Sequence, residues 1–359
     1  EVPVVYGGSR TPVVVPVVFR AHAKCLPTIA TAVVVAVYAN ADGDPRTARC
    51  EFELPLSLVC RVIPPVKNAD FKLTLDTDQP PTSLPALFDD VLNAPSGGAD
   101  MASKAAPNVL SFQYLSGPDV TILLSKNAGR YRLQSGSFEA LWLLASELRR
   151  RLISALPGVE VSFNEPLPLQ EYFDLIDTHF AHRLALVAQH KDLEARAQQF
   201  RVVQKRLLVR FKDRNPSPLS NLDLLLSGTF DQLMALAAQA EETQAELARA
   251  SANLSCGTQL INLLITLRFE LDAANAEALS AYLSPRVEDS LDQGWEERTD
   301  SALTHLLRFT LGKSSKDNAA SMALPPMAMP QDVTKLKKHI TVMCDRLSKG
   351  GRFKQPGGQ

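Results

Sequence analysis

The sequence has no apolar run long enough to cross a lipid bilayer. The most apolar run in its helical half, residues 260–269, contains Asn262 and Arg268, whereas a membrane-spanning helix needs ~20 mostly apolar residues. The valine-rich start is interrupted by Pro12 and Pro16 and lacks a basic region, which argues against a signal peptide. The chain also lacks an initiator Met and opens in what reads as a strand, so we expect the C-terminal fragment of a larger protein.

An excess of charge of either sign is missing as well. The 359 residues include 38 Lys and Arg against 39 Asp and Glu, which gives a formal net charge of -1. A general nucleic-acid-binding protein carries a basic excess, because it must neutralise phosphates. We therefore expect no nucleic-acid partner.

Cysteines are few and scattered. The five are Cys25, Cys50, Cys60, Cys256 and Cys344. The sequence contains no Cys-x-x-Cys pair and no Cys/His cluster, so neither a zinc site nor a disulfide framework is indicated. We expect reduced thiols and a cytoplasmic protein.

Motifs for catalysis and nucleotide binding are equally scarce. There is no Gly-x-Ser-x-Gly motif and no local Ser/His/Asp or Cys/His arrangement. Residues 312–314 end like a phosphate-binding loop, but Leu307 stands where the leading glycine belongs. His179 and His182 have the i, i+3 spacing of a metal-binding pair, although a solvated or core-edge position is more usual for such residues. We predict no enzyme, no catalytic, cofactor-binding or metal-binding residue, and no cofactor.

Two long helices dominate the middle of the chain. Neither proline nor glycine occurs between residues 169 and 215, so one helix could run roughly 65–70 Å. Pro216 and Pro218 end it, and a second helical block follows over residues 219–272. Apolar residues of the first block recur in steps of three and four, as in a coiled-coil seam: Leu169, Phe173, Ile176, Phe180, Leu184 and Val187, then Leu193, Ala197, Phe200, Val203, Leu207 and Phe211. A short break between such helices predicts an antiparallel hairpin.

Residues 1–63 have the pattern of β-structure. Valine-rich runs at residues 12–19, 30–39 and 47–62 are separated by turn-forming residues. The third run alternates apolar residues from Cys50 to Cys60, which predicts one buried face. Three strands without a helical period predict part of a β-sandwich.

The next hundred residues predict a small α/β platform, in which one or two helices cover a sheet. The expected strands lie at residues 71–75, 109–115, 120–125, 130–134 and 159–163, and the expected helices at residues 84–92 and 138–156. After the hairpin, helices are expected at residues 276–282, 287–311 and 332–349.

The fold class is therefore multidomain α+β, with seven segments in order. These are a partial β-sandwich (residues 1–63), an α/β platform (64–166), a long helical hairpin (167–274), a helical bundle (275–321), a linker (322–330), a C-terminal amphipathic helix (331–350) and a tail (351–359).

Five stretches of the chain, in order, resemble the Bardet-Biedl syndrome 9 family. They are CEFELPLSLVC (residues 50–60), LPLQEYFDLIDTHF (167–180), AQQFRVVQKRLLVRFKDRNPSPLSNLD (197–223), QGWEERTDSALTHLLRF (293–309) and LKKHITVMCDRLSKGGR (336–352). The resemblance implies an N-terminal β-propeller missing from this chain, followed by an adaptin-ear-like sandwich, a platform and C-terminal helices. Alanine-rich stretches depart from the vertebrate pattern, which indicates a distant homologue, such as one from an alga or protist.

Function also follows from the resemblance. It implies a non-enzymatic scaffold subunit of the BBSome, a coat-like complex that carries membrane-protein cargo in ciliary trafficking and ciliogenesis. The implied partners are other BBSome subunits, with tetratricopeptide repeats or propellers, and the ciliary or plasma membrane contacted peripherally. The implied locations are the cytoplasm, the cilium and its basal body.

Two alternatives stay open. One is a subunit of another vesicle coat or adaptor complex. The other is an enzyme with a site in the platform, whose carboxylates are Asp70, Asp76, Asp78, Asp89 and Asp90, with no histidine nearby.

Two surfaces are candidates for partner binding. The first is a basic run on the first hairpin helix, expected to meet an acidic partner rather than lipid: Arg201, Lys205, Arg206 and Arg210. The second is the apolar face of the C-terminal helix, expected to dock on a tetratricopeptide-repeat subunit or, alternatively, to complete the chain's own bundle: Val333, Leu336, Ile340, Met343 and Leu347.

Overall fold

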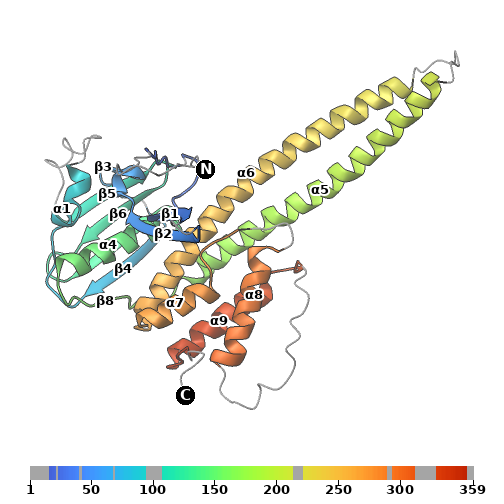
Figure 1. The fold of residues 1–359 in the computed structure, drawn as a ribbon. Helices are drawn as coiled ribbons and strands as arrows, with labels where there is room; N and C mark the ends of the chain where they lie inside the picture. The colour runs from blue at the N-terminus through green and yellow to red at the C-terminus, as the bar shows by residue number, and fades with distance from the viewer. Residues whose placement is uncertain are drawn as a thin grey trace.

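The computed structural model describes residues 16–21, 23–39, 43–67, 69–93, 107–212, 221–288, 293–311 and 329–353. Within these residues the chain is a mixed α+β structure with two sheets and a long helical hairpin (Figure 1). The hairpin projects from a globular part that holds the larger sheet, and the C-terminal helices lie beside its base (Figure 1). The mixed α+β class and the hairpin predicted from the sequence are confirmed.

Six antiparallel strands form the larger sheet, in the order β3-β5-β6-β7-β4-β8. They are β3 (Cys60–Ile63), β4 (Phe71–Thr77), β5 (Val109–Tyr114), β6 (Asp119–Leu124), β7 (Arg130–Ser135) and β8 (Val161–Ser162). Gly117 turns the chain between β5 and β6 with a φ of 115°, a conformation that residues with a Cβ disfavour.

Helix α4 (Leu141–Ala155) covers this sheet together with α1 (Leu84–Leu87) and α2 (Asp89–Leu92) (Figure 1). Their buried side chains share one apolar core with the strands. The single helix predicted over residues 84–92 is wrong in one respect: Phe88 leaves the helical conformation, at φ -120° and ψ 30°, and divides it into α1 and α2.

The smaller sheet is an antiparallel ribbon of β1 (Thr31–Ala39) and β2 (Pro45–Glu53). Every residue of β2 and all but one of β1 are exposed. Residues 16–19, the described end of the first predicted strand, are not in a strand. The described residues thus show a ribbon and no sandwich.

The single strand predicted over residues 47–62 is wrong. Its first part is β2, Leu56–Leu58 form a turn of 3-10 helix, and Cys60–Ile63 is β3 of the larger sheet. The predicted buried face is therefore wrong for Cys50 and Phe52, which are exposed. Apolar alternation marks a pleated strand, but burial requires a layer packed on it, and the described residues place none over β2.

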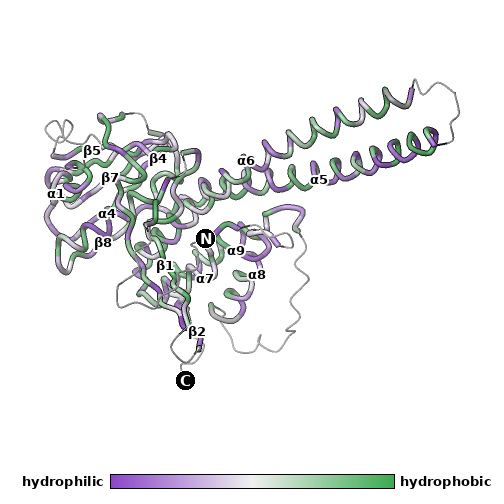
Figure 2. The backbone as a smooth tube through the Cα atoms, turned by 45° about the horizontal axis from the view of Figure 1, so that its top comes forward, coloured by the Kyte–Doolittle hydropathy of each residue, from purple (hydrophilic) through white to green (hydrophobic). Residues whose placement is uncertain are grey.

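The hairpin consists of α5 (Leu169–Lys212) and α6 (Leu222–Arg268), with 44 and 47 residues. Hydrophilic and hydrophobic residues alternate along both helices (Figure 2). Ile176 and Phe180 of the predicted apolar stripe are buried, whereas Leu184, Val187 and Phe211 are exposed. The apolar stripe therefore predicts which residues are buried only near the base of the hairpin, where other elements also pack against the two helices. The predicted break at residues 216–218 lies outside the described residues.

The C-terminal bundle contains α7 (Ala273–Tyr282), α8 (Trp295–His305), a short π-helix (Leu306–Thr310) and α9 (Thr334–Ser348). The helix predicted over residues 287–311 starts only at Trp295, with Gly294 as its N-cap. Most of the predicted linker, residues 322–328, lies outside the described part. Within the described residues, none of the helices has the length and apolarity that crossing a membrane requires.

Candidate functional site

The base of the hairpin is a buried junction of three helices. Tyr172, Ile176, His179 and Phe180 lie on one face of α5, at steps of four, three and one, and all four are buried. The hydroxyl of Thr258 on α6 donates to the carbonyl of Leu254, so its oxygen accepts the proton of the Tyr172 hydroxyl at 2.9 Å. Burial raises the pKa of the Tyr172 phenol, because desolvation disfavours the phenolate.

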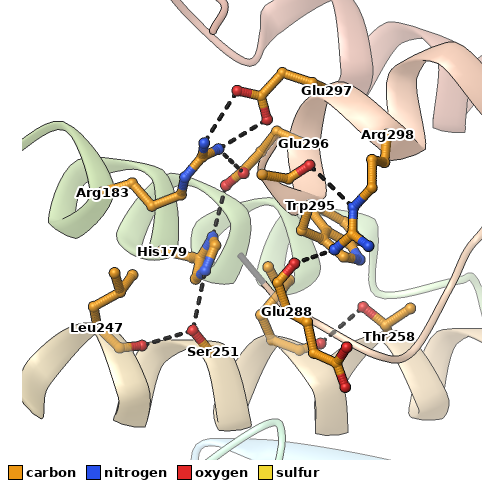
Figure 3. A network of polar contacts seen from close by, with 12 residues as sticks. His179, Arg183, Leu247, Ser251, Thr258, Glu288, Trp295, Glu296, Glu297 and Arg298 are labelled. Atoms are coloured by element: carbon orange, nitrogen blue, oxygen red, sulfur yellow. Dashed lines mark hydrogen bonds and ion pairs between the residues drawn. The ribbon is translucent and has the colours of Figure 1, made fainter. Parts of the chain in front are cut away.

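A charged network crosses the same junction (Figure 3). Nδ1 of His179 lies 2.6 Å from a carboxylate oxygen of Glu296, at the start of α8. The guanidinium of Arg183 donates to Glu296 at 2.5 Å, and to both carboxylate oxygens of Glu297 at 2.9 and 3.0 Å. Nε2 of His179 lies 3.2 Å from the Ser251 hydroxyl. Side chains of α5, α6 and α8 therefore meet in one network.

The charges of this network are well placed for burial. Glu296 and His179 are 1% and 0% exposed, and buried carboxylates are tolerated only when they are paired and hydrogen-bonded. Both glutamates lie in the first turn of α8, where the helix dipole favours negative charge. A Cβ at Gly294 would come within 2.1 Å of three guanidinium atoms of Arg183, so the missing side chain leaves room for the arginine. The network fixes the C-terminal bundle to the hairpin.

The tip of the hairpin, residues 200–212 of α5 and 224–234 of α6, has a different surface. The end of α5 carries exposed basic and apolar side chains together, and we call these seven residues the tip patch: Arg201, Val202, Lys205, Arg206, Leu208, Val209 and Arg210. All seven are exposed. Phe211 and Leu224 nearby are 79% and 71% exposed. Phe200 and Phe230 contact each other across the two helices, with ring centroids 6.1 Å apart.

The four basic residues predicted to bind a partner all belong to the tip patch. Their side chains are all exposed. The structure thus places them near one end of the hairpin, where each is open to solvent. Partner binding by these residues stays a prediction.

The second predicted surface, the apolar face of the C-terminal helix, is buried rather than exposed. The five apolar residues, four in α9 and one at its N-cap, are 0–6% exposed. They are Val333, Leu336, Ile340, Met343 and Leu347. Helix α9 packs beside α8 in the chain's own bundle (Figure 1). This is the alternative that the sequence left open. Partner binding through this face stays a prediction that requires α9 to leave its bundle.

The two histidines that resemble a metal pair serve other purposes. His179 belongs to the buried network, and Nδ1 of His182 lies 3.5 Å from Glu246 of α6. No group of three potential metal ligands occurs in the described part of the chain. The loop that resembles a phosphate-binding motif, residues 312–314, lies outside it.

Three of the platform carboxylates have separate hydrogen-bond partners. Asp76 accepts from Arg130 at 3.0 Å, and Asp78 accepts from the amide of Glu160 at 2.8 Å. Arg151 bonds to Asp90, and this hydrogen bond lowers the pKa of the carboxyl.

The five cysteines are free thiols. Burial raises the pKa of Cys60 and Cys344 to about 12, because an apolar environment disfavours the thiolate. Burial therefore disfavours the thiolate, which is the reactive form of these two side chains.

Sequence reasoning missed the network at the hairpin base. Glu296 is 117 residues from His179 and 113 from Arg183, so no local spacing links them. The only available signal is the i, i+4 pair of His179 and Arg183 on an apolar stripe, which indicates a polar group at a buried position.

Three family models match consecutive parts of the chain. They are the PTHB1 platform domain over residues 55–165, the PTHB1 hairpin over residues 166–269 and the PTHB1 C-terminal helix bundle over residues 271–347. PTHB1 is the Bardet-Biedl syndrome 9 protein.

Curated relatives carry the same name. Protein PTHB1 of Xenopus laevis is 44% identical over 319 residues, which are 88% of this chain and 37% of the relative. Protein PTHB1 of Homo sapiens is 45% identical over 319 residues, 88% of this chain and 35% of the relative. A pthb1 homolog of Caenorhabditis elegans is 22% identical over 278 residues, 77% of this chain and 33% of that protein. The chain thus spans about a third of the length of these relatives.

These findings correct two expectations. The expected distant relationship is wrong, because frog and human proteins are 44–45% identical to most of the chain. The comparisons also give no indication of the expected β-propeller protein, because the matched models are a platform domain, a hairpin and a helix bundle. Three PTHB1 models follow one another without overlap from residue 55 to residue 347, and the chain therefore belongs to the PTHB1 family.

Proposed function

We propose that this protein is a non-enzymatic scaffold subunit of the BBSome in ciliary trafficking. The similarity to PTHB1 proteins over 88% of the chain supports this role. The single observation that carries the mechanism is the tip patch, an exposed basic and apolar surface at the end of a long hairpin. A scaffold needs a rigid extension that reaches a neighbour, and α5 extends roughly 66 Å at 1.5 Å per residue.

The composition of the tip patch indicates its partner. Exposed apolar residues that gather on one surface mark interaction sites, and here Val202, Leu208 and Val209 lie among four cations. A partner surface with apolar residues and surrounding carboxylates would complement both features. We assign the tip patch to an acidic protein surface of another BBSome subunit. Contact with tetratricopeptide-repeat or propeller subunits in particular stays a prediction.

A charge-reversal experiment tests this assignment. The tagged chain is expressed in ciliated cells, and the proteins that co-purify are quantified by mass spectrometry. We expect BBSome subunits with the native chain and at least ten-fold less of one subunit with Lys205→Glu/Arg210→Glu. The matched control is Lys72→Glu/Arg132→Glu, which reverses two exposed charges of the platform and should leave recovery unchanged. Equal recovery with both double variants would contradict the assignment.

The same variants separate a protein partner from lipid. If the native chain sediments with vesicles containing anionic lipid and the tip variant does not, while subunit recovery is equal, the patch binds membrane instead. Peripheral location at the ciliary membrane would then depend on this chain directly.

The exposed ribbon of β1 and β2 supports one further structural assignment. Its valines are exposed, for example Val35 and Val37 at 55% and 75%, as expected of strands that belong to a larger layer. We propose that the ribbon is part of an adaptin-ear-like sandwich. The division into seven segments also stays a prediction, and limited proteolysis that maps the cleavage sites tests it.

A further inference from the structure

A pocket of about 420 Å³ lies where the platform, the hairpin and the C-terminal bundle meet. Three helices line it with regularly spaced residues: α4 at positions 142, 146 and 149, α6 at 259, 262, 263 and 266, and α7 at 273, 276 and 280. Apart from the neighbours 262 and 263, successive positions differ by three or four, which places each set on one helix face. The volume lies within the range of small-ligand sites, ≈300–1,000 Å³.

Two residues that line this pocket each carry a buried polar atom that lacks a partner among the described residues. The Nε atom of Arg149 is buried and makes no hydrogen bond there, and the same holds for the Oδ1 atom of Asn262. Asn262 is 7% exposed, and its amide nitrogen donates to the carbonyl of Leu283 at 3.0 Å. The unpartnered oxygen therefore belongs to a side chain whose orientation is fixed. A buried polar group without a partner is costly, so a ligand that satisfies both groups would bind favourably.

Arg149 is unusual among the arginines of α4. Arg150 bonds to Glu147 and lies 3.0 Å from Glu53, and Arg151 bonds to Glu147 and Asp90. Burial lowers the pKa of Arg149, and the described part of the chain sets no carboxylate against it. A cation that is partly buried without a counter-ion favours the binding of an anion.

The two groups together define the ligand. Arg149 needs an anionic acceptor, and Asn262 Oδ1 needs a donor. A phosphate monoester carries about two negative charges at pH 7 and mostly lacks a hydroxyl donor. A peptide with an acidic side chain offers a carboxylate and also backbone N–H groups. The apolar lining from Trp142 and Leu263 suits the methylene groups of such a side chain.

We propose that this pocket binds a glutamate- or aspartate-bearing peptide segment, with the carboxylate on Arg149 and an amide N–H donating to Asn262. The site rests on the proposed function only in that a neighbouring subunit would supply the segment. Binding of a short peptide needs no complex, so a failure of this proposal would leave the scaffold role and the tip patch untouched.

Fluorine NMR of the full chain labelled with 5-fluorotryptophan tests the proposal. The chain has two tryptophans. Trp142 lines the pocket, whereas Trp295 donates to the carbonyl of Ser284 at the hairpin base and serves as an internal reference. The probes are acetyl-Ala-Glu-Ala-amide, its Gln counterpart and sodium phosphate. We expect the Glu peptide to shift the Trp142 resonance saturably, and the Gln peptide to bind at least ten-fold more weakly.

Two variants complete the test. Arg149→Met should weaken binding of the Glu peptide at least ten-fold while the Trp295 resonance and the melting temperature show an intact fold. Arg150→Met, on the same helix but outside the pocket, should bind like the native chain. Equal binding of the Glu and Gln peptides, or unchanged binding by Arg149→Met, would overturn the proposal. Phosphate binding as tight as that of the Glu peptide would overturn the assignment to a peptide.

Discussion

The base and the tip of the hairpin belong to the same two helices but are stabilised in different ways. At the base, α5 and α6 are covered by the platform and the C-terminal bundle, and Tyr172, Ile176 and His179 are fully buried. At the tip, each helix has only the other, and seam residues such as Phe200 and Val203 are half-buried. The helical pattern alone therefore does not determine how stable each part of the hairpin is. The number of elements packed against that part does.

This difference also separates two roles. The base carries a charge network that is closed upon itself, which suits a structural joint. The tip carries charges and apolar side chains that face outward, which suits an interface. The predictions below test whether the two regions respond to substitution as this division requires.

The largest effect is expected from Arg183→Met. The substitution leaves Glu296 and Glu297 buried with one partner fewer, and breaking one side of a buried ion pair costs about 3–5 kcal/mol. Urea unfolding followed by circular dichroism measures the change. Arg201→Met, in the tip patch of the same helix, is the control and should stay within about 0.5 kcal/mol. Equal effects of the two substitutions would remove the distinction between base and tip.

Truncation of uncharged, apolar side chains should show the same difference between the base and the tip of the hairpin. Ile176→Ala at the base should cost about 2–5 kcal/mol, because the residue is fully buried. Phe211→Ala should cost less than about 0.5 kcal/mol, although the periodicity places both residues in one stripe. Thermal unfolding compares them, and a large loss for Phe211→Ala would show that the tip is more enclosed than we describe.

A smaller effect is expected from Tyr172→Phe. The phenylalanine keeps the ring and removes only the hydrogen bond to Thr258, whose net contribution is about 1 kcal/mol. The melting temperature should fall slightly with no change in co-purifying subunits. A loss of partners with unchanged stability would instead make the base part of an interface.

The smallest effect concerns Glu139, at the start of the segment that leads into α4. Burial raises the pKa of this carboxyl, so the folded state favours its neutral form. Protonated Glu139 is compatible with folding, so the fold keeps its full stability below the pKa that Glu139 has in the unfolded chain. This stability is lost as the pH rises through the higher pKa that Glu139 has in the folded chain. Glu139→Gln should therefore stabilise the chain by less than about 1 kcal/mol at pH 7 and have no effect at pH 3. A stabilisation that is equal at both pH values would exclude the titration of Glu139 as its cause.

Much of the local structure can be predicted from particular residues. The absence of glycine and proline from residue 169 to residue 215 predicts one uninterrupted helix, and α5 covers 44 of these residues. The turn residues between the strands of the larger sheet likewise separate β5, β6 and β7 close to where they end. The basic residues of the tip patch were identified from their charge and spacing alone, because an exposed surface depends little on distant partners.

The sequence by itself thus determined the helices, most strands and the exposed basic surface, since these depend on neighbours a few residues apart. Only the tertiary structure decided that β3 leaves the run of β2 to join the larger sheet, and that the apolar face of α9 is covered by its own bundle. The same holds for the contacts of His179 and Arg183 with the start of α8, and for the pocket at Arg149. Each of these joins residues that are tens to more than a hundred positions apart, and their meeting depends on how the helices and the sheet pack against one another.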